Sequence, residues 1–194
     1  MELSIPVQRV DLGGTDGWIT GAGDLAVGVK HVLKHSRENG SILSVGGEYL
    51  FAIGDEQRGL GAGSDIFESY LAYGKVLGDS SFVQVQATAE YPIETEFADE
   101  YGIRAAFGRT LTFGSPYGRI WTPMFEVTGK REDESGADTE WDVIPQIQIS
   151  LSQRQHIMAG AGLKVPVTQK ADRSTEFVFY LLWDWFDGGV REGW

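Results

Sequence analysis

The chain has 194 residues, about the size of one domain, and 42% of them are hydrophobic. Its formal net charge of −12 argues against a nucleic-acid partner, which would need a basic surface. Cysteine is absent, which excludes disulfides, thiolate metal sites and cysteine nucleophiles. Neither a run of 18 apolar residues nor a charged-then-apolar leader occurs, so no membrane-spanning helix or signal peptide is predicted. We expect either a cytoplasmic protein or a mature or truncated chain.

Apolar and polar residues alternate through most of the sequence, in runs bounded by turn residues. This period of two predicts ten β-strands and no helix of comparable strength. The predicted strands cover residues 2–10, 24–34, 41–53, 65–77, 82–91, 100–113, 118–128, 139–151, 155–165 and 174–185. Many of them reach the roughly 9–11 residues that a tilted strand needs to cross a bilayer.

The connections between these strands alternate in length. Long polar connections cover residues 11–23, 54–64, 92–99, 129–138 and 166–173, and short ones cover 35–40, 78–81, 114–117 and 152–153. In an up-and-down antiparallel barrel, this puts the long loops at one end and the short turns at the other, the layout of bacterial outer-membrane barrels. We therefore predict an all-β, antiparallel, up-and-down transmembrane β-barrel of about ten strands, with both termini at the short-turn end.

The two faces of the predicted strands differ in chemistry. Odd-numbered positions are aliphatic and aromatic, whereas even-numbered positions carry charged residues, glutamine, glycine and alanine. An inward even face would make a membrane barrel, and an inward odd face would make a soluble carrier with an apolar cavity. Glycine and alanine suit a narrow lumen better than an exposed strand surface, which favours the membrane barrel. Tryptophans toward strand ends on the odd face are typical of aromatic girdles at a membrane boundary: Trp121, Trp141, Trp183 and Trp185.

Charged residues of the even face are predicted to meet across the short hairpins. If each short turn closes a hairpin, opposite charges face one another in three pairs: Lys30 with Glu48, Arg104 with Glu126, and Asp142 with Lys164. The fourth hairpin places Glu68 opposite Glu90, two carboxylates that should share a proton, bind a cation or use a cationic neighbour. The predicted lumen-lining residues are Lys30, Glu48, Glu68, Glu90, Arg104, Glu126, Asp142 and Lys164.

No catalytic residue, metal site or cofactor is predicted. His31 and His35 share the odd face near a short turn, but no third metal ligand is evident. Ser36 and Ser41 lie near His35 without the spacing of a hydrolase site. Residues 59–63 superficially match a phosphate-binding loop, yet the lysine and helix that should follow are absent, so a flexible loop is expected. We therefore do not expect an enzyme.

One segment resembles a known family. The sequence GDLAVGVK at residues 23–30, followed by the glycine-rich residues 54–61, resembles the bacterial outer-membrane barrels known as phenol-degradation meta-pathway transporters. Related barrels are often encoded beside c-type cytochromes, and LWDWFDGG at residues 182–189 is similar to their endings. The resemblance covers most of the chain and implies a Gram-negative outer-membrane protein with a transport role. It also implies a signal peptide and further N-terminal sequence, so the barrel has twelve strands if N-terminal strands are missing here.

The predicted organisation is one barrel domain over residues 1–186 and a C-terminal tail over residues 187–194. A ten-stranded lumen is largely filled by side chains, which predicts a narrow channel or uptake protein for a small molecule, apolar and aromatic ones included. One alternative is a structural or partner-binding outer-membrane barrel that seats a cytochrome or another periplasmic or surface protein. The third hypothesis is a soluble ligand-carrier barrel. The expected partners are outer-membrane lipid, a small-molecule substrate and such a protein; the substrate and the oligomeric state stay open.

Overall fold

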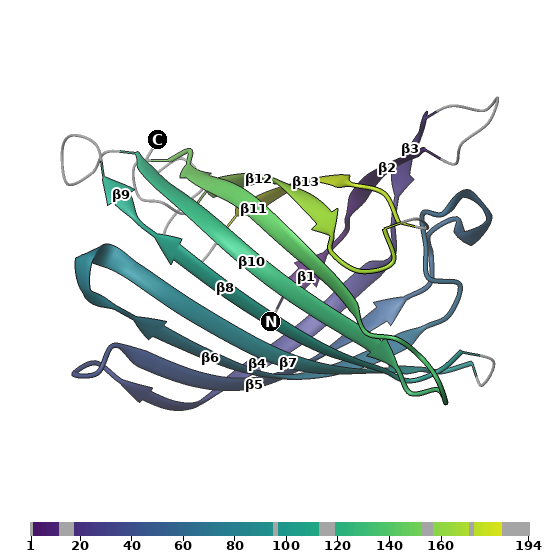
Figure 1. Cartoon of the computed structure of the whole chain (residues 1–194), viewed down its shortest axis with the longest axis horizontal. Coiled ribbons are helices and arrows are strands. Elements are labelled where there is room, and N and C mark those ends of the chain that lie inside the picture. Colours follow the sequence, from purple (N-terminus) through teal and green to yellow (C-terminus); the bar gives the residue numbers. More distant parts are fainter. Residues whose placement is uncertain are drawn as a thin grey trace.

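The computed structural model describes residues 2–11, 18–94, 97–112, 119–152, 157–170 and 173–183. Ten strands follow one another in a single antiparallel sheet, which curls into a half-barrel (Figure 1). They are β1 (Glu2–Ser4), β4 (Leu25–Ser36), β5 (Ser41–Phe51), β6 (Ile66–Val76), β7 (Ser81–Pro92), β8 (Glu100–Arg109), β10 (Ile120–Glu132), β11 (Glu140–Ser150), β12 (Ile157–Pro166) and β13 (Glu176–Trp183). The short β9 (Leu111–Thr112) pairs with β10 beside β8. The predicted all-β, antiparallel, up-and-down sheet is confirmed.

The predicted first strand, residues 2–10, is wrong in its extent. Only β1 joins the main sheet, opposite residues 26–28 of β4. Pro6 follows β1, and proline has no N–H to donate to a ladder. The chain then forms a separate hairpin of β2 (Val7–Asp11) and β3 (Trp18–Ala22), which projects beyond the sheet (Figure 1). The Gly23 N–H donates to the Pro6 carbonyl at 2.8 Å and closes the base of this hairpin.

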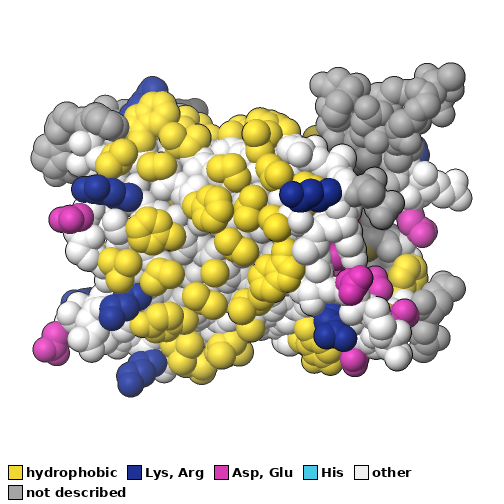
Figure 2. Space-filling model, in the orientation of Figure 1, with side chains coloured by type: hydrophobic (Ala, Val, Ile, Leu, Met, Phe, Trp, Pro, Cys, Tyr) yellow, Lys and Arg dark blue, Asp and Glu magenta, His cyan; other side chains and the backbone are white. Residues whose placement is uncertain are grey.

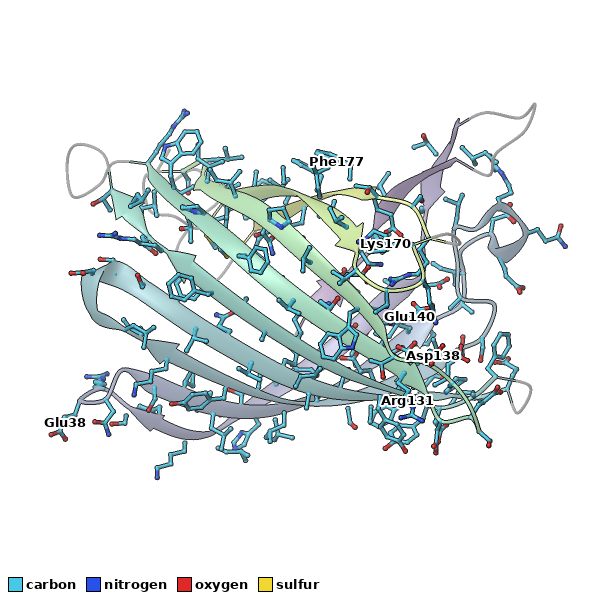
Figure 3. The ribbon with its side chains drawn as sticks, viewed as in Figure 1. Glu38, Arg131, Asp138, Glu140, Lys170 and Phe177 are labelled. Atoms are coloured by element: carbon cyan, nitrogen blue, oxygen red, sulfur yellow. The ribbon has the colours of Figure 1, made fainter. Side chains whose placement is uncertain are left out.

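The connections sort to two ends of the sheet as predicted. The β5–β6, β7–β8, β10–β11 and β12–β13 connections and the β2–β3 hairpin lie at one end, called the long-loop end below. The β4–β5 and β6–β7 turns lie at the opposite, short-turn end. Figure 3 shows Glu38 at the short-turn end and Arg131 and Asp138 at the long-loop end. Among the described residues, no helix is long and apolar enough to cross a membrane.

The even-numbered positions face the concave side of the sheet. Two cavities on that side are lined mainly by even positions, from Lys30 and Ser44 on β4 and β5 to Glu126 on β10. Large apolar residues at odd positions stand exposed on the convex side, for example Leu71 and Phe107. Figure 2 shows their side chains covering the middle of the visible face, with charged groups mostly toward its margins. The period-two alternation therefore assigned the inner and outer faces correctly, except in the last residues of β4.

Small residues let aromatic rings lie flat inside the half-barrel. The Tyr70 ring on β6 covers Gly46 on β5, and the Tyr180 ring on β13 covers Gly160 on β12. A Cβ at either glycine would collide with the ring. The Tyr180 hydroxyl then donates to Gln148 Oε1 on β11 at 3.0 Å. Glycine in these strands thus makes room for polar aromatic side chains that partly fill the interior.

A β-bulge in β4 separates the two histidines that were predicted to share a face. The register of β4 against β5 shifts by one residue between Val32 and Lys34. His31 consequently lies opposite Val45, on the convex face, and His35 lies opposite Ile42, which lines a concave-side cavity. One extra residue reverses the sides of all positions after it. The expectation that His31 and His35 share a face is therefore wrong.

Candidate functional site

Four carboxylates form one row across four neighbouring strands. Glu48 on β5 lies opposite Glu68 on β6, and Glu68 lies opposite Glu90 on β7. Glu90 in turn lies opposite Glu100 on β8. The predicted facing of Glu68 and Glu90 is confirmed, whereas Glu100 was not among the predicted residues. The row lies near the long-loop end of these strands, and we call these four residues the acidic row.

Lys130 on β10 is the closest cation to the end of this row. Its Nζ lies 2.5 Å from Glu100 Oε1 and 3.7 Å from Glu90 Oε1. Lys130 was not among the predicted site residues, because residues 129–138 were predicted to form a loop, whereas β10 continues to Glu132. The alternation continues through Lys130 on the even face, and this was the available signal.

A cavity of about 380 Å³ opens on the concave side over the acidic row. Its charged lining groups are Lys30, Glu48, Glu68, Glu90, Arg104 and Lys130. A second cavity of about 230 Å³ shares Lys30 and Arg104 and also contacts Glu126. Acidic groups from β5–β7 and basic groups from β4, β8 and β10 thus line one connected polar surface along the interior.

Arg104, Glu126 and Gln146 form a bridge across β8, β10 and β11. Arg104 Nε lies 2.9 Å from Glu126 Oε1, and Gln146 Nε2 donates to Glu126 Oε2 at 2.7 Å. The predicted ion pair exists, but the two residues are not directly opposite, because Arg104 faces Thr128 and Glu126 faces Ala106. A register displaced by two residues keeps each side chain on its face, and a long arginine reaches the diagonal neighbour.

Asp142 on β11 is held by two cations. Lys164 Nζ on β12 lies 3.9 Å from Asp142 Oδ2, and Arg173 Nη2 lies 2.6 Å from the same oxygen. Asp142 faces Pro166 and not Lys164, so the predicted register is again displaced by two. Arg173 also pairs with Glu140 at 3.4 Å. It lies in a predicted loop and was not among the predicted site residues. Asp142 is 3% exposed, and its Oδ1 has no hydrogen-bond partner among the described residues.

The predicted facing pair of Lys30 and Glu48 is also displaced. Lys30 lies opposite Gly46, and Glu48 lies opposite Gly28, so the two are diagonal neighbours lining the same cavity. The bulge in β4 shifts this ladder, and a bulge cannot be located from alternation alone. Six of the eight residues predicted to line a lumen thus line the two concave-side cavities, and the other two, Asp142 and Lys164, contact each other. Three of the four predicted facings are changed.

Asp24 organises the largest described connection at the long-loop end. Its Oδ1 accepts the Gly54 N–H at 2.8 Å and its Oδ2 accepts the Ala62 N–H at 2.7 Å. Leu60 is 2% exposed and packs against Gly21 of the β2–β3 hairpin. The glycine-rich residues 59–63 are thus held in place by a hydrogen bond to Asp24 and by the buried Leu60 side chain, whereas a flexible loop was expected. The segment resembling a known family, residues 23–30, begins at this clamp.

No family model matches the chain, and no curated protein matches it either. The resemblance to phenol-degradation meta-pathway transporters therefore stays a prediction. Within the described part of the chain, no group of three or more histidines, aspartates and glutamates is placed to hold a metal ion. The predicted tail, residues 187–194, lies outside the described residues, as does Trp185.

Proposed function

We propose that this chain forms the wall of an outer-membrane β-barrel in a Gram-negative bacterium, with a narrow interior that passes small polar molecules. The observation that carries the proposal is the segregation of the two faces. Exposed apolar side chains such as Leu71, Phe107 and Leu163 cover the convex side, and charged groups line the concave side. This is the inverse of a water-soluble barrel, whose apolar side chains face inward.

Energetics favour lipid against the convex face. Each Å² of apolar surface removed from water contributes roughly 25 cal/mol. The exposed apolar side chains come from most strands of the sheet, including Val85 on β7, Phe125 on β10 and Ile147 on β11. A belt of this extent is unfavourable in water and favourable in a bilayer. The charged interior also speaks against the soluble-carrier alternative, which requires an apolar cavity.

The interior favours small polar solutes over apolar or aromatic ones. The larger cavity is lined by charged groups, with Tyr70, Gln86 and Thr88 among its other lining residues. Carboxylates of the acidic row stand on one wall, and Lys130 lies at the end of that row. The cavity lining holds three carboxylates and three cations, but the acidic row groups four carboxylates beside Lys130, so we expect a modest preference for cations over anions.

Lipid exposure is tested with fluorophore-labelled cysteines, which the cysteine-free chain accepts without background. Leu71→Cys and Phe107→Cys report on the convex face, and the adjacent Ala72→Cys and Ala106→Cys report on the concave face. After reconstitution into vesicles containing nitroxide-labelled lipid, we expect quenching at the first two positions and little at the second two. Equal quenching on both faces, or a folded chain that stays in solution without lipid, overturns the membrane location.

Ion preference is tested by the reversal potential of the reconstituted protein under a potassium chloride gradient. We expect a preference for potassium, which falls when Glu48, Glu68 and Glu90 are all changed to glutamine. The matched control changes three exposed loop carboxylates, Glu38→Gln, Asp79→Asn and Glu134→Gln, and keeps the preference. A membrane-inserted protein that passes neither ion overturns the channel and favours the structural or partner-binding barrel.

A further inference from the structure

The larger concave-side cavity carries opposite charges at its two ends. Toward the long-loop end it is bordered by the acidic row, which includes Glu68 and Glu90. Toward the short-turn end it is bordered by Arg104 on β8, which lies opposite Gln86 on β7. Gln86 and Glu90 are four residues apart on one strand, so at roughly 3.3 Å per residue their backbone positions are about 13 Å apart. The cavity is therefore negative at one end and positive at the other.

At the acidic end, Glu68 faces the cavity without a cation. Lys130 Nζ lies 2.5 Å from Glu100 Oε1 and 3.7 Å from Glu90 Oε1, so the charge of Lys130 is directed to those two carboxylates. Glu68 lines the same cavity, and it forms no ion pair with any other described residue. A carboxylate in a confined interior favours a neighbour of opposite charge. This end of the cavity thus suits a ligand that brings a positive charge.

At the other end, the guanidinium of Arg104 is accessible from the cavity. Its contact with Glu126 is made through Nε, and the Arg104 side chain is still 60% exposed, which leaves its two terminal amino groups accessible. Glu126 lies opposite Ala106, two residues farther from the acidic row, so this contact draws the guanidinium away from Glu68. Lys30 lines the same two cavities as Arg104 and adds positive charge there. A planar guanidinium binds a carboxylate through two parallel hydrogen bonds.

The floor between the two ends is low and polar. Tyr70, Thr88 and Gly102 lie side by side on β6, β7 and β8, at the level between Glu90 and Gln86. Gly102 has no side chain to fill the cavity, and a Cβ there would collide with the Thr88 side chain. The Thr88 hydroxyl and the Gln86 amide are hydrogen-bonding groups in the cavity lining. A ligand along this floor meets polar groups at its middle as well as charges at its ends.

We propose that this cavity binds small zwitterions whose ammonium and carboxylate groups are several bonds apart, which is the chemistry of a dipeptide. The ammonium group contacts Glu68, and the carboxylate contacts the terminal amino groups of Arg104. The peptide group between them lies over Thr88 and Gln86. An α-amino acid carries both charges on neighbouring atoms and is too short to reach both ends. The proposal rests on the polar interior of the proposed function and names the solute class that this interior takes.

The test measures binding of alanylalanine to the full chain in lipid nanodiscs by isothermal titration calorimetry, with empty nanodiscs as the blank. Three related probes each lack one feature of this ligand. N-acetyl-alanylalanine lacks the ammonium charge, alanylalanine amide lacks the carboxylate charge, and alanine lacks the separation between the two charges. We expect each of them to bind more weakly than alanylalanine by a factor of about five or more, because one charge-assisted contact is lost.

Two variants assign the ends of the ligand to the ends of the cavity. Glu68→Gln should weaken alanylalanine and its amide by a factor of about five or more and leave the N-acetyl peptide unchanged. R104Q/E126Q removes both members of the ion pair, so no carboxylate is left alone there. It should weaken alanylalanine and the N-acetyl peptide by a similar factor and leave the amide unchanged. Glu38→Gln, in the β4–β5 turn, is the matched control and should change none of the affinities.

Three results overturn the proposal. The first is the absence of binding heat from alanylalanine. The second is an alanylalanine affinity no higher than that of its two blocked forms. The third is an alanylalanine affinity that Glu68→Gln and R104Q/E126Q both leave unchanged. Nitroxide quenching in the same nanodiscs and the reversal potential require no peptide, so they separate these failures from failure of the membrane location or of ion passage.

Discussion

Arg104 on β8 and Glu126 on β10 meet at 2.9 Å, measured from Nε to Oε1, although neither lies directly opposite the other. Glu126 is 9% exposed, and its second carboxylate oxygen accepts the Gln146 side-chain amide. A buried carboxylate thus links three strands, and Arg104 supplies its neighbouring positive charge. Removing the cation leaves that charge uncompensated in a confined interior.

We predict that Arg104→Leu destabilises the folded protein by about 2–3 kcal/mol, because a hydrogen bond to a charged group is lost and Glu126 stays buried. The double variant Arg104→Leu/Glu126→Leu should be more stable than Arg104→Leu alone, since it also removes the buried carboxylate that has lost its cation. Urea unfolding in vesicles, followed by tryptophan fluorescence, measures both. A double variant whose loss equals the sum of the two single losses would contradict this coupling.

A second prediction concerns the ion pair between Arg173 and Asp142. Arg173→Met should cost about 3 kcal/mol, because Asp142 is almost fully buried and keeps only Lys164, whose Nζ is 3.9 Å away. Lys170→Met is the matched control, since Lys170 lies exposed in the same connection (Figure 3), and it should stay within about 0.5 kcal/mol of the parent. Equal losses for the two variants in the same unfolding experiment would show that Arg173 acts only as a surface charge.

A third prediction follows from the Tyr70 ring that lies over Gly46. Gly46→Ala forces a Cβ into the ring, and we expect a loss of about 1–3 kcal/mol from overpacking. Gly78→Ala is the control, because an added Cβ there meets nothing within 4 Å. Comparable thermal unfolding midpoints for the two variants would mean that Tyr70 moves aside without cost.

The fourth prediction concerns the Asp24 clamp at the long-loop end. Asp24→Ala leaves the Gly54 and Ala62 N–H groups without their acceptor, so we expect a loss of about 2–4 kcal/mol and faster amide exchange at both positions. Asp55→Ala changes a half-exposed carboxylate in the same loop, 4.0 Å from Arg58, and should change stability by less than about 1 kcal/mol. Unchanged exchange at Gly54 and Ala62 in Asp24→Ala would refute the clamp.

Alternation by itself determined the main-sheet strands from β4 onward and, except after the bulge in β4, their two faces. In a β-strand each residue points to the side opposite its neighbour, so an apolar odd face and a polar even face can be assigned without any tertiary information. Six of the eight residues predicted to line a lumen contact the concave-side cavities for this reason. The facing of Glu68 and Glu90 was also predictable, since the β6–β7 hairpin is regular from end to end.

Only the tertiary structure decided which charges meet. Register depends on turn geometry and bulges, and a displacement by two residues leaves every side chain on its face, so the hydrophobic pattern is equally satisfied before and after it. The bulge in β4, the diagonal reach of Arg104 and the contact of Arg173 with Asp142 were invisible for this reason. The complete acidic row needed three successive registers to align, and the curl of the sheet into a half-barrel is a property of all its strands that no single strand encodes.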